Sequence, residues 1–263
     1  MPRRYYNVLL PLLSGALAFA VWQVVCLLLD EDHRFLLPAP LAVLAALRDE
    51  WPVLSHAALN TAQGALLGFA LAVVISFTLA LALASARWVR ASFYPYLMLL
   101  QMTPVILFVP MLVIWVGPGL PSVSLITFLI CFFPLVVNTT QGLVSADRLL
   151  VELFRMYRAT RWQEMWRLRV PAALPYFFTG LRIAATLAPI GAVVGDYSAG
   201  SSAGDGGGLG FRAVIYGSTA KYPALFATAA VTCALGFVLV AAVLALSQLT
   251  LGRWHDSYAQ KDN

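Results

Sequence analysis

The chain has 263 residues, of which 61 % are hydrophobic and 11 % are charged. A soluble domain carries about 25 % charged residues, so this composition excludes an ordinary soluble protein and indicates a membrane protein. The net charge is +5, but the arginines flank apolar runs instead of forming a basic patch with interleaved aromatic residues, and this pattern argues against nucleic-acid binding.

Residues 8–86 predict two membrane spans. Residues 8–29 are uncharged and long enough to cross a hydrocarbon core of about 30 Å. A cleaved signal peptide is the alternative, but its apolar region would be only about 7–15 residues long, so we favour a retained span. Residues 30–56 are mixed in character and rich in proline, which predicts an exterior connection with a short interfacial helix. Residues 57–86 are uncharged and predict the second span.

The long uncharged run at residues 91–146 predicts two more spans. As a single helix it would measure roughly 84 Å, against about 30 Å of hydrocarbon core. The turn-rich sequence at 115–121 divides it into predicted spans over 92–115 and 121–144. Pro104 and Pro110 predict a kink or an interrupted start in the first of these.

A charged segment, residues 147–170, separates these spans from the rest of the chain. A fifth span is predicted over 174–196 and a sixth over 222–250. Between them, residues 198–210 are rich in glycine and serine and predict a loop. The fold class is therefore all-α and integral to a membrane, with six transmembrane helices in a single domain, residues 1–263.

The distribution of lysine and arginine predicts the orientation. With the N-terminus inside, the cytoplasmic segments hold 12 basic residues and the exterior segments hold 4. Because basic residues gather near the cytoplasmic ends of spans, both termini and the segment 147–170 are predicted to be cytoplasmic. The glycine-rich sequence at 204–210 lacks the Lys-Ser/Thr that completes a nucleotide-binding phosphate loop.

The segment 152–171 predicts two short helices with a sharp bend between them. It carries five arginines and two glutamates. Apolar residues before the bend recur at three- and four-residue steps, which is helical spacing. Thr160 and Gln163 have the spacing of a capping box, so one helix is expected to end near Arg158 and the next to begin at Arg161. The second is expected to end before the closing proline, which disfavours helical geometry in the residue before it.

Several motifs together resemble one family. They are Glu152 with Leu168, Val170 and Pro171, the sequences LLPAP (36–40), FFPLVVNTTQGL (132–143) and PAALPYFFTGLRIA (171–184), and GLG (208–210). On these residues the chain resembles the permease subunits of bacterial ABC importers, the binding-protein-dependent transport inner-membrane components, in the branch for nitrate, sulfonates, taurine and thiamine precursors.

The resemblance has departures within its charged motif. Leu153 and Phe154 stand where the family has alanines, and Arg158 stands where it has a glycine. A glycine adopts left-handed geometry without steric cost, whereas another residue loses about 1 kcal/mol. Either Arg158 tolerates this conformation, or the backbone of the bend differs from that of the family.

The resemblance implies a type I ABC importer permease fold in the bacterial cell inner membrane. The implied partners are a second permease copy, two ATPase subunits that bind ATP and Mg²⁺, an extracytoplasmic solute-binding protein and membrane lipid. This chain would bind no cofactor or metal and would not be an enzyme. The charged segment would be the coupling helix region that contacts the ATPase. Its implied coupling residues are Glu152, Arg155, Arg158, Ala159, Thr160, Arg161 and Trp162.

Four polar residues in predicted spans are candidates for lining the pathway. Asn138, Thr139 and Gln141 belong to a polar run that can line the pathway or bond to neighbouring helices, and the sequence does not decide between these roles. Asp196 at the exterior edge can be solvated, support a gate, have a structural role or contact the substrate. Arg182 is expected to reach the inner interface or to pair with a carbonyl, with anchoring of the charged segment to the fifth span as the alternative.

No residue pattern predicts catalysis. The three cysteines lie in separate apolar runs without metal-ligand spacing, and we expect them to be small buried residues. A membrane-embedded enzyme acting on lipid or isoprenoid substrates, and a passive scaffold or receptor subunit, are the alternatives of other classes. By resemblance, residues 132–143 favour a thiamine-precursor pyrimidine or riboflavin as the solute, and sulfonate, taurine and nitrate remain alternatives.

Overall fold

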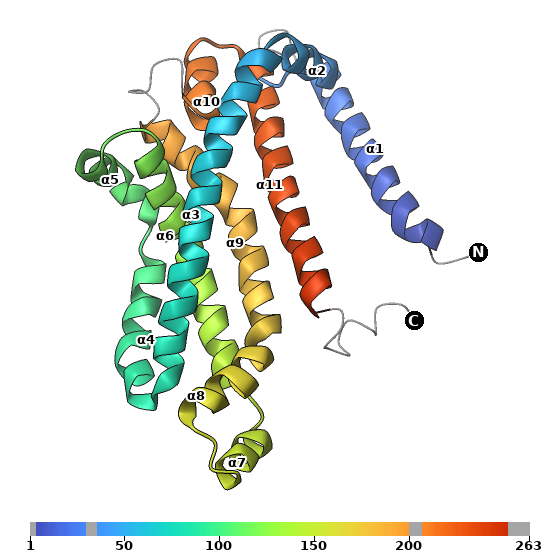
Figure 1. The fold of residues 1–263 in the computed structure, drawn as a ribbon. Coiled ribbons are helices and arrows are strands. Elements are labelled where there is room, and N and C mark those ends of the chain that lie inside the picture. Colours follow the sequence, from blue (N-terminus) through green and yellow to red (C-terminus); the bar gives the residue numbers. More distant parts are fainter. Residues whose placement is uncertain (1–3, 30–35, 200–206, 252–263) are drawn as a thin grey trace.

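The computed structural model describes residues 4–29, 36–199 and 207–251, and within these ranges every regular element is a helix (Figure 1). The elements are α1 (Arg4–Leu28), α2 (Pro40–Asp49), α3 (Trp51–Ser85), α4 (Arg87–Met102), η1 (Val105–Phe108), α5 (Val109–Val116), α6 (Leu120–Val144), α7 (Arg148–Met156), α8 (Arg161–Glu164), the π-helix η2 (Met165–Arg169), α9 (Val170–Ala199), α10 (Leu209–Ser218) and α11 (Tyr222–Leu251). The predicted all-α class is confirmed.

Five helical stretches of the described residues are long and apolar enough to cross a membrane. They are Leu9–Leu28, Trp51–Ser85, Leu120–Val144, Arg161–Ala199 and Tyr222–Thr250. α4 and the helices over Val105–Val116 are together apolar and long enough for a sixth crossing, but they meet at a bend of 77°. They count as a sixth span only if this bent pair is taken as one. Pro104 lies at this bend as the N-cap residue of η1 and has no backbone N–H to continue α4, as its position predicted.

The structure differs from the expected elements at α3 and α10. α3 begins at Trp51, six residues before the predicted span, because Pro52 occupies the first turn, where its missing N–H costs nothing. α10 falls partly in the predicted loop 198–210 and was not expected as a helix. Of that predicted loop, residues 200–206 lie outside the described part of the chain.

Helices α3, α6 and α9 form the packed centre of the molecule, and small residues allow their close approach. On α3 a small residue is buried at every fourth position, namely Gly64, Gly68, Ala72, Ser76 and Ala80. Van der Waals contact between helices at small side chains is a main source of helix association in a bilayer. A side chain at Gly68 would overlap the Ser124 carbonyl oxygen and approach the Phe128 backbone nitrogen to 2.9 Å.

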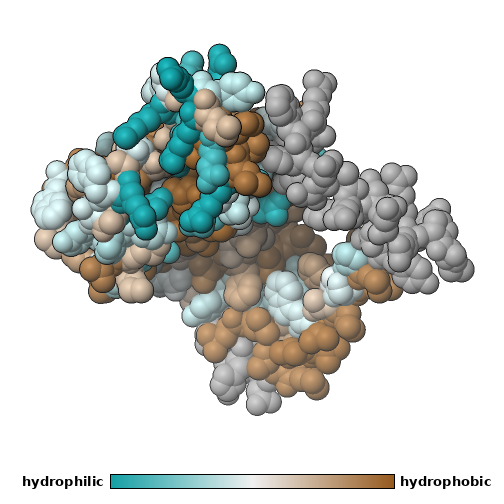
Figure 2. Space-filling model, turned by 90° about the horizontal axis from the view of Figure 1, so that it is seen from below, coloured by the Kyte–Doolittle hydropathy of each residue, from teal (hydrophilic) through white to brown (hydrophobic). Residues whose placement is uncertain are grey.

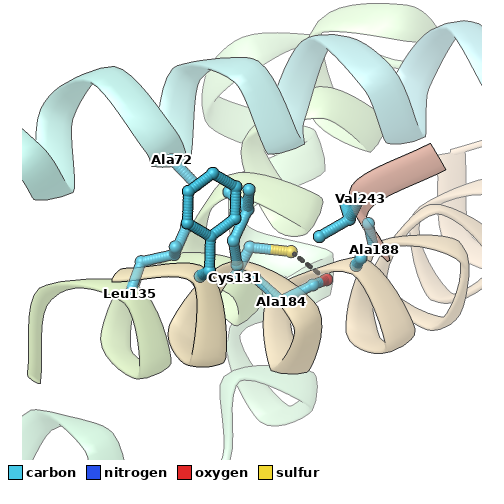
Figure 3. Close-up of a cluster of buried hydrophobic side chains, with 9 residues drawn as sticks. Ala72, Cys131, Leu135, Ala184, Ala188 and Val243 are labelled. Atoms are coloured by element: carbon cyan, nitrogen blue, oxygen red, sulfur yellow. Dashed lines mark hydrogen bonds between the residues drawn. The ribbon is translucent and has the colours of Figure 1, made fainter. Parts of the chain in front are cut away.

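Figure 3 shows a buried cluster in this packed centre, in which Cys131 is surrounded by residues from four helices, namely Ala72, Leu135, Ala188 and Val243. The Cys131 thiol donates a hydrogen bond to the Ala184 carbonyl oxygen at 3.3 Å. Cys131 and Cys26 are buried, as expected for small apolar residues, but Cys233 is exposed within this chain. The expectation of three buried cysteines is therefore wrong at Cys233, which lines an open cavity between α11 and residues of α9 and α10.

Helix α1 stands apart from the packed centre. Figure 1 shows it leaning away from α11, with α2 as its connection to the rest of the chain. Only 6 % of its candidate span is buried, and its leucines are exposed along most of its length. This helix consequently has a large apolar surface that lipid or another protein chain must cover.

Candidate functional site: the polar elbow

The charged segment folds into a compact projection at one end of the helix bundle (Figure 1), and we call residues 147–169 the elbow. Its first helix, α7, begins at the N-cap residue Asp147, whose carboxylate accepts a hydrogen bond from the Leu149 backbone nitrogen at 2.9 Å. A carboxylate at this position also interacts favourably with the positive end of the helix dipole.

The end of α7 shows which of the two predicted backbone conformations Arg158 adopts. This residue is left-handed, with φ of 53°. The Ala159 nitrogen donates to the Phe154 carbonyl oxygen at 3.0 Å, and the Arg158 nitrogen donates to the Arg155 carbonyl oxygen at 2.9 Å. These two bonds form a Schellman motif, the arrangement that usually has glycine at this position. Arg158 therefore adopts the geometry that a glycine would supply in the family.

We expect Arg158→Gly to stabilise the elbow locally by about 1 kcal/mol, because it removes the steric cost of a left-handed side chain. Amide hydrogen exchange of the α7 C-terminus is the measurement, and exchange should slow about fivefold. Gly217→Ala in α10, where an added methyl group meets no atom within 4 Å, controls for global changes. Faster exchange at the elbow in Arg158→Gly would show that the arginine side chain holds the bend.

The predicted capping box is confirmed. The Gln163 nitrogen donates to the Thr160 hydroxyl oxygen at 3.3 Å, and the Thr160 nitrogen donates to the Gln163 side-chain oxygen at 2.9 Å. These reciprocal bonds satisfy two backbone donors at the start of α8. They fix the direction in which the chain leaves the bend.

The expectation that the second helix ends before Pro171 is wrong. α8 passes into the π-helix η2 and then into α9 without a break, and Val170 has helical dihedral angles of −64° and −48°. The Val170 nitrogen donates to the Met165 carbonyl oxygen, five residues back. Since α9 starts at Val170, Pro171 lies in its first turn, where a missing N–H is tolerated. The elbow is thus continuous with a membrane span.

An ion pair that the sequence did not predict holds the elbow against the bundle. Arg169 contacts Glu164 through two nitrogens, at 2.6 and 2.8 Å, and approaches the Leu143 carbonyl oxygen on α6 at 3.5 Å. The two charged residues are five positions apart, which is outside the three- and four-residue spacings that bring side chains together on an α-helix. Only the wider turn of η2 aligns them, and the sequence contains no clear signal for that turn.

Glu152 was expected to help hold the shape of the elbow and to contact the ATPase. It is exposed and forms no hydrogen bond or ion pair with any described residue, so no bond of its own supports the first of these roles, and the second stays a prediction. It lines a cavity of about 250 Å³ together with Arg148, Arg155 and Arg169. Its carboxylate is therefore available to a group from outside this chain.

Large apolar side chains are exposed on the elbow next to its charges. Trp162 is 71 % exposed and contacts Trp166 in a tilted arrangement with ring centroids 5.4 Å apart, and Met156 and Tyr157 are also exposed. Figure 2, seen from the elbow end, shows hydrophilic side chains gathered on one part of this face beside apolar ones. Exposed aromatic residues within a polar rim are typical of protein interaction surfaces. Arg155, Arg158, Thr160 and Arg161 are exposed in the same region, and Ala159 is half-buried.

The predicted pathway residues of α6 have different environments. Thr139 is fully buried, and its hydroxyl donates to the Leu135 carbonyl oxygen at 2.6 Å. Asn138 is half-buried and donates to the Pro134 carbonyl oxygen at 2.8 Å, whereas Gln141 is exposed. Within this single chain only Gln141 and part of Asn138 face open space. A pathway role for all three stays a prediction that this conformation does not test.

Asp196 lies in a buried hydrogen-bond network at the end opposite the elbow. It is 4 % exposed and accepts a hydrogen bond from the Thr61 hydroxyl at 2.6 Å. The same hydroxyl oxygen accepts from the Leu209 backbone nitrogen at 2.8 Å, and Gly210 supplies a backbone hydrogen bond to the carboxylate. A side chain at Gly208 would overlap the carboxylate. The glycines of the GLG motif therefore let α10 start directly on Asp196.

This network joins three helices that are distant in the sequence. Thr61 belongs to α3, Asp196 to α9 and Leu209 to α10. The arrangement favours a structural role for Asp196 over solvation at the exterior edge. Contact between Asp196 and a substrate stays an untested prediction. Thr61 was missed because a lone threonine in an apolar helix gives no signal of its distant partner.

A second contact at the same end joins α10 to the start of α3. The Tyr216 hydroxyl donates to a Glu50 carboxylate oxygen at 3.0 Å, and Lys221 pairs with the other Glu50 oxygen at 3.5 Å. Burial and the adjacent carboxylate raise the pKa of Tyr216 to about 12. The phenol therefore stays protonated and keeps this hydrogen bond at neutral pH.

Arg182 is exposed on α9 and has no ion pair with any described residue. It does not anchor the elbow in this structure. Arg169 has that role instead, through its contact with the Leu143 carbonyl oxygen. Its expected reach to the inner interface is compatible with this exposure.

The fold and the elbow together define a multi-pass membrane protein with an exposed polar projection continuous with one of its spans. Residues 51–254 match the family described as binding-protein-dependent transport system inner membrane component. The chain belongs to this family. It is the permease subunit of an ABC importer for small solutes, and it is not an enzyme.

Comparison with known proteins agrees with this assignment. The chain is 33 % identical to the formylaminopyrimidine transport permease protein of Halalkalibacterium halodurans over 250 residues, which cover 95 % of this chain and 97 % of the relative. It is 35 % identical to the riboflavin transport system permease protein of Chloroflexus aurantiacus over 246 residues, covering 92 % and 88 %. It is 25 % identical to a putative aliphatic sulfonates transport permease protein of Bacillus subtilis over 259 residues, covering 97 % and 91 %.

Proposed function

We propose that this permease forms the translocation pathway for a small heterocyclic solute of the thiamine-precursor pyrimidine or riboflavin type. The support is the similarity to the formylaminopyrimidine and riboflavin permeases, at 33 and 35 % identity over most of each chain. Similarity to the permeases for sulfonates, nitrate and taurine is lower, at 25 to 28 %. Sulfonate, taurine or nitrate transport is the alternative assignment.

The transporter contains two copies of this chain, two ATPase subunits that bind ATP and Mg²⁺, and an extracytoplasmic binding protein that delivers the solute. The family supports a second permease copy, and the exposed apolar length of α1 leaves surface for that copy or for lipid. The bacterial inner membrane contains the complex, with both termini of the chain in the cytoplasm. The excess of basic residues in the segments assigned to the inside, 12 against 4, supports this orientation.

The observation that carries the mechanism is the continuity of the elbow with α9. Arg169 pairs with Glu164 and contacts α6, so the short helix and the start of α9 move together. α9 is 30 residues long, or roughly 45 Å, and reaches Asp196 near its other end. A push on the elbow by closing ATPase subunits is thereby transmitted to the contacts of α3 and α10 at the far end.

These parts describe alternating access. Binding of ATP closes the ATPase pair, the two elbows approach, and α9 shifts relative to α3 and opens the pathway to the outside. Hydrolysis resets the pair. The ATPase carries out the chemical step, and this chain contributes the elbow with α9, which transmits the movement, and the pathway.

Reconstitution in vesicles with the ATPase and the binding protein tests the solute assignment. We expect ATP-dependent uptake of a formylaminopyrimidine or of riboflavin, and no uptake above background for taurine, an alkyl sulfonate or nitrate. Vesicles without ATP are the control. Uptake of a sulfonate, taurine or nitrate in place of both heterocycles would contradict the proposed solute class and leave the permease assignment standing.

A further inference from the structure

A pocket of about 380 Å³ lies between α4 and α6 near the elbow end of the bundle. Arg87, Arg90 and Tyr94 line it from α4, and Thr140, Gln141 and Val144 line it from α6. We call it the α4–α6 pocket. It shares no lining residue with the cavity at Glu152 except Val144, and the coupling mechanism does not use it.

The pocket is positively charged without an internal counter-charge. Neither Arg87 nor Arg90 has an ion pair or hydrogen bond with any described residue. α4 begins at Arg87 without a side-chain cap, so its first backbone N–H groups lack intrahelical partners. The helix is 16 residues long, and its positive end therefore adds to the charge of the two arginines.

A buried hydroxyl lining the pocket is the independent sign of a ligand. Thr140 is 1 % exposed, and its hydroxyl has no hydrogen-bond partner among the described residues. Thr139, Thr179 and Thr228 each donate to the carbonyl oxygen four residues earlier on their helices, and Thr140 does not. The hydroxyls of Ser124 and Thr127 on α6 are also buried without a partner, but of these three only Thr140 lines this pocket. A buried hydroxyl without a partner costs free energy, so this donor is expected to have a partner from outside the chain.

The surroundings favour the headgroup of a membrane lipid as the source of the anion. Thr140 lies four residues before the end of α6, or roughly 6 Å along the helix, so the pocket is near the edge of the span. No residue of α4 is buried, and Phe93, Leu99 and Leu100 are exposed along it. Acyl chains can lie on this apolar surface while the headgroup enters the pocket. A free phosphate ion would use only the polar part.

We propose that the α4–α6 pocket binds the phosphate group of an anionic phospholipid through Arg87, Arg90 and the Thr140 hydroxyl. This site includes Gln141, one of the candidate pathway residues, and it lies outside the elbow. Its assignment to the cytoplasmic leaflet rests on the proposed orientation. Basic pockets between transmembrane helices on that side bind anionic headgroups in other membrane proteins.

Lipid binding to the full-length permease, purified in detergent, tests the proposal by native mass spectrometry. The probes are phosphatidylglycerol, phosphatidylcholine and inorganic phosphate. We expect phosphatidylglycerol to bind at least about tenfold more tightly than phosphatidylcholine. Arg87→Gln with Arg90→Gln should remove this preference, and Thr140→Val should weaken phosphatidylglycerol binding severalfold. Arg161→Gln with Arg167→Gln, which removes two exposed elbow arginines, is the control of equal charge and should keep the preference.

Two results would overturn the proposal. Equal phosphatidylglycerol affinity in the Arg87/Arg90 variant and in the Arg161/Arg167 variant would show a non-specific charge effect. Binding of inorganic phosphate that is lost in the Arg87/Arg90 variant, with no preference for phosphatidylglycerol, would assign the pocket to a free anion instead of a lipid. Because binding is measured on the permease alone, either result leaves the transport assignment untouched.

Discussion

Gly68→Ala should destabilise the permease by about 3 kcal/mol, at the upper end of the cost of overpacking a core. The added methyl group would overlap the Ser124 carbonyl oxygen and crowd the Phe128 nitrogen, both of which belong to the backbone of α6. Backbone atoms cannot rotate away as a side chain can, so α3 and α6 would have to separate. Thermal unfolding of the purified protein is the measurement.

Gly217→Ala is the matched control for this change. It places the same methyl group on α10, where no atom lies within 4 Å. Alanine has the higher helix propensity, and we expect no loss of stability there. If Gly68→Ala unfolded at the same temperature as Gly217→Ala, the close packing of α3 on α6 would not be a source of stability.

Trp162→Ala should weaken association with the ATPase about 30-fold. The tryptophan is 71 % exposed, and an exposed aromatic residue that becomes buried at the centre of an interface contributes about 2 kcal/mol to binding. ATP-driven uptake should fall in parallel, because fewer complexes are assembled. The measurement is the affinity of the purified permease for the ATPase subunit.

Trp115→Ala is the control, since Trp115 is 70 % exposed at the end of α5 and far from the elbow. Glu152→Ala is the second test variant. It removes no bond within the described residues, so a loss of ATPase affinity there cannot come from a damaged elbow. Unchanged affinity in both elbow variants would contradict the assignment of this surface to the ATPase.

The elements that could be predicted from the sequence are those governed by local rules. The apolar runs predicted the all-α class, and the spacing of Thr160 and Gln163 predicted the capping box, because both depend on neighbours along the chain. The left-handed Arg158 could be stated only as one of two alternatives. A family glycine indicates the required geometry, but only the hydrogen bonds show that arginine adopts it.

The features that could not be predicted depend on contacts or on unusual helical geometry. The π-helix aligns Glu164 with Arg169, and this register is invisible to rules written for an α-helix. The bond between Thr61 and Asp196 joins residues 135 positions apart. Pro171 was expected to stop a helix because the local rule for the residue before a proline was applied without knowledge of the preceding π-turn.

The accessibility of residue 162 in sealed membrane vesicles tests the central claim most directly. In the variant Trp162→Cys with Cys233→Ser, the remaining cysteines, Cys26 and Cys131, are buried. A membrane-impermeant maleimide should label this variant in inside-out vesicles and not in right-side-out vesicles, and bound ATPase should block the labelling. Labelling from the external face, or labelling from the cytoplasmic face that the ATPase does not reduce, would contradict the account.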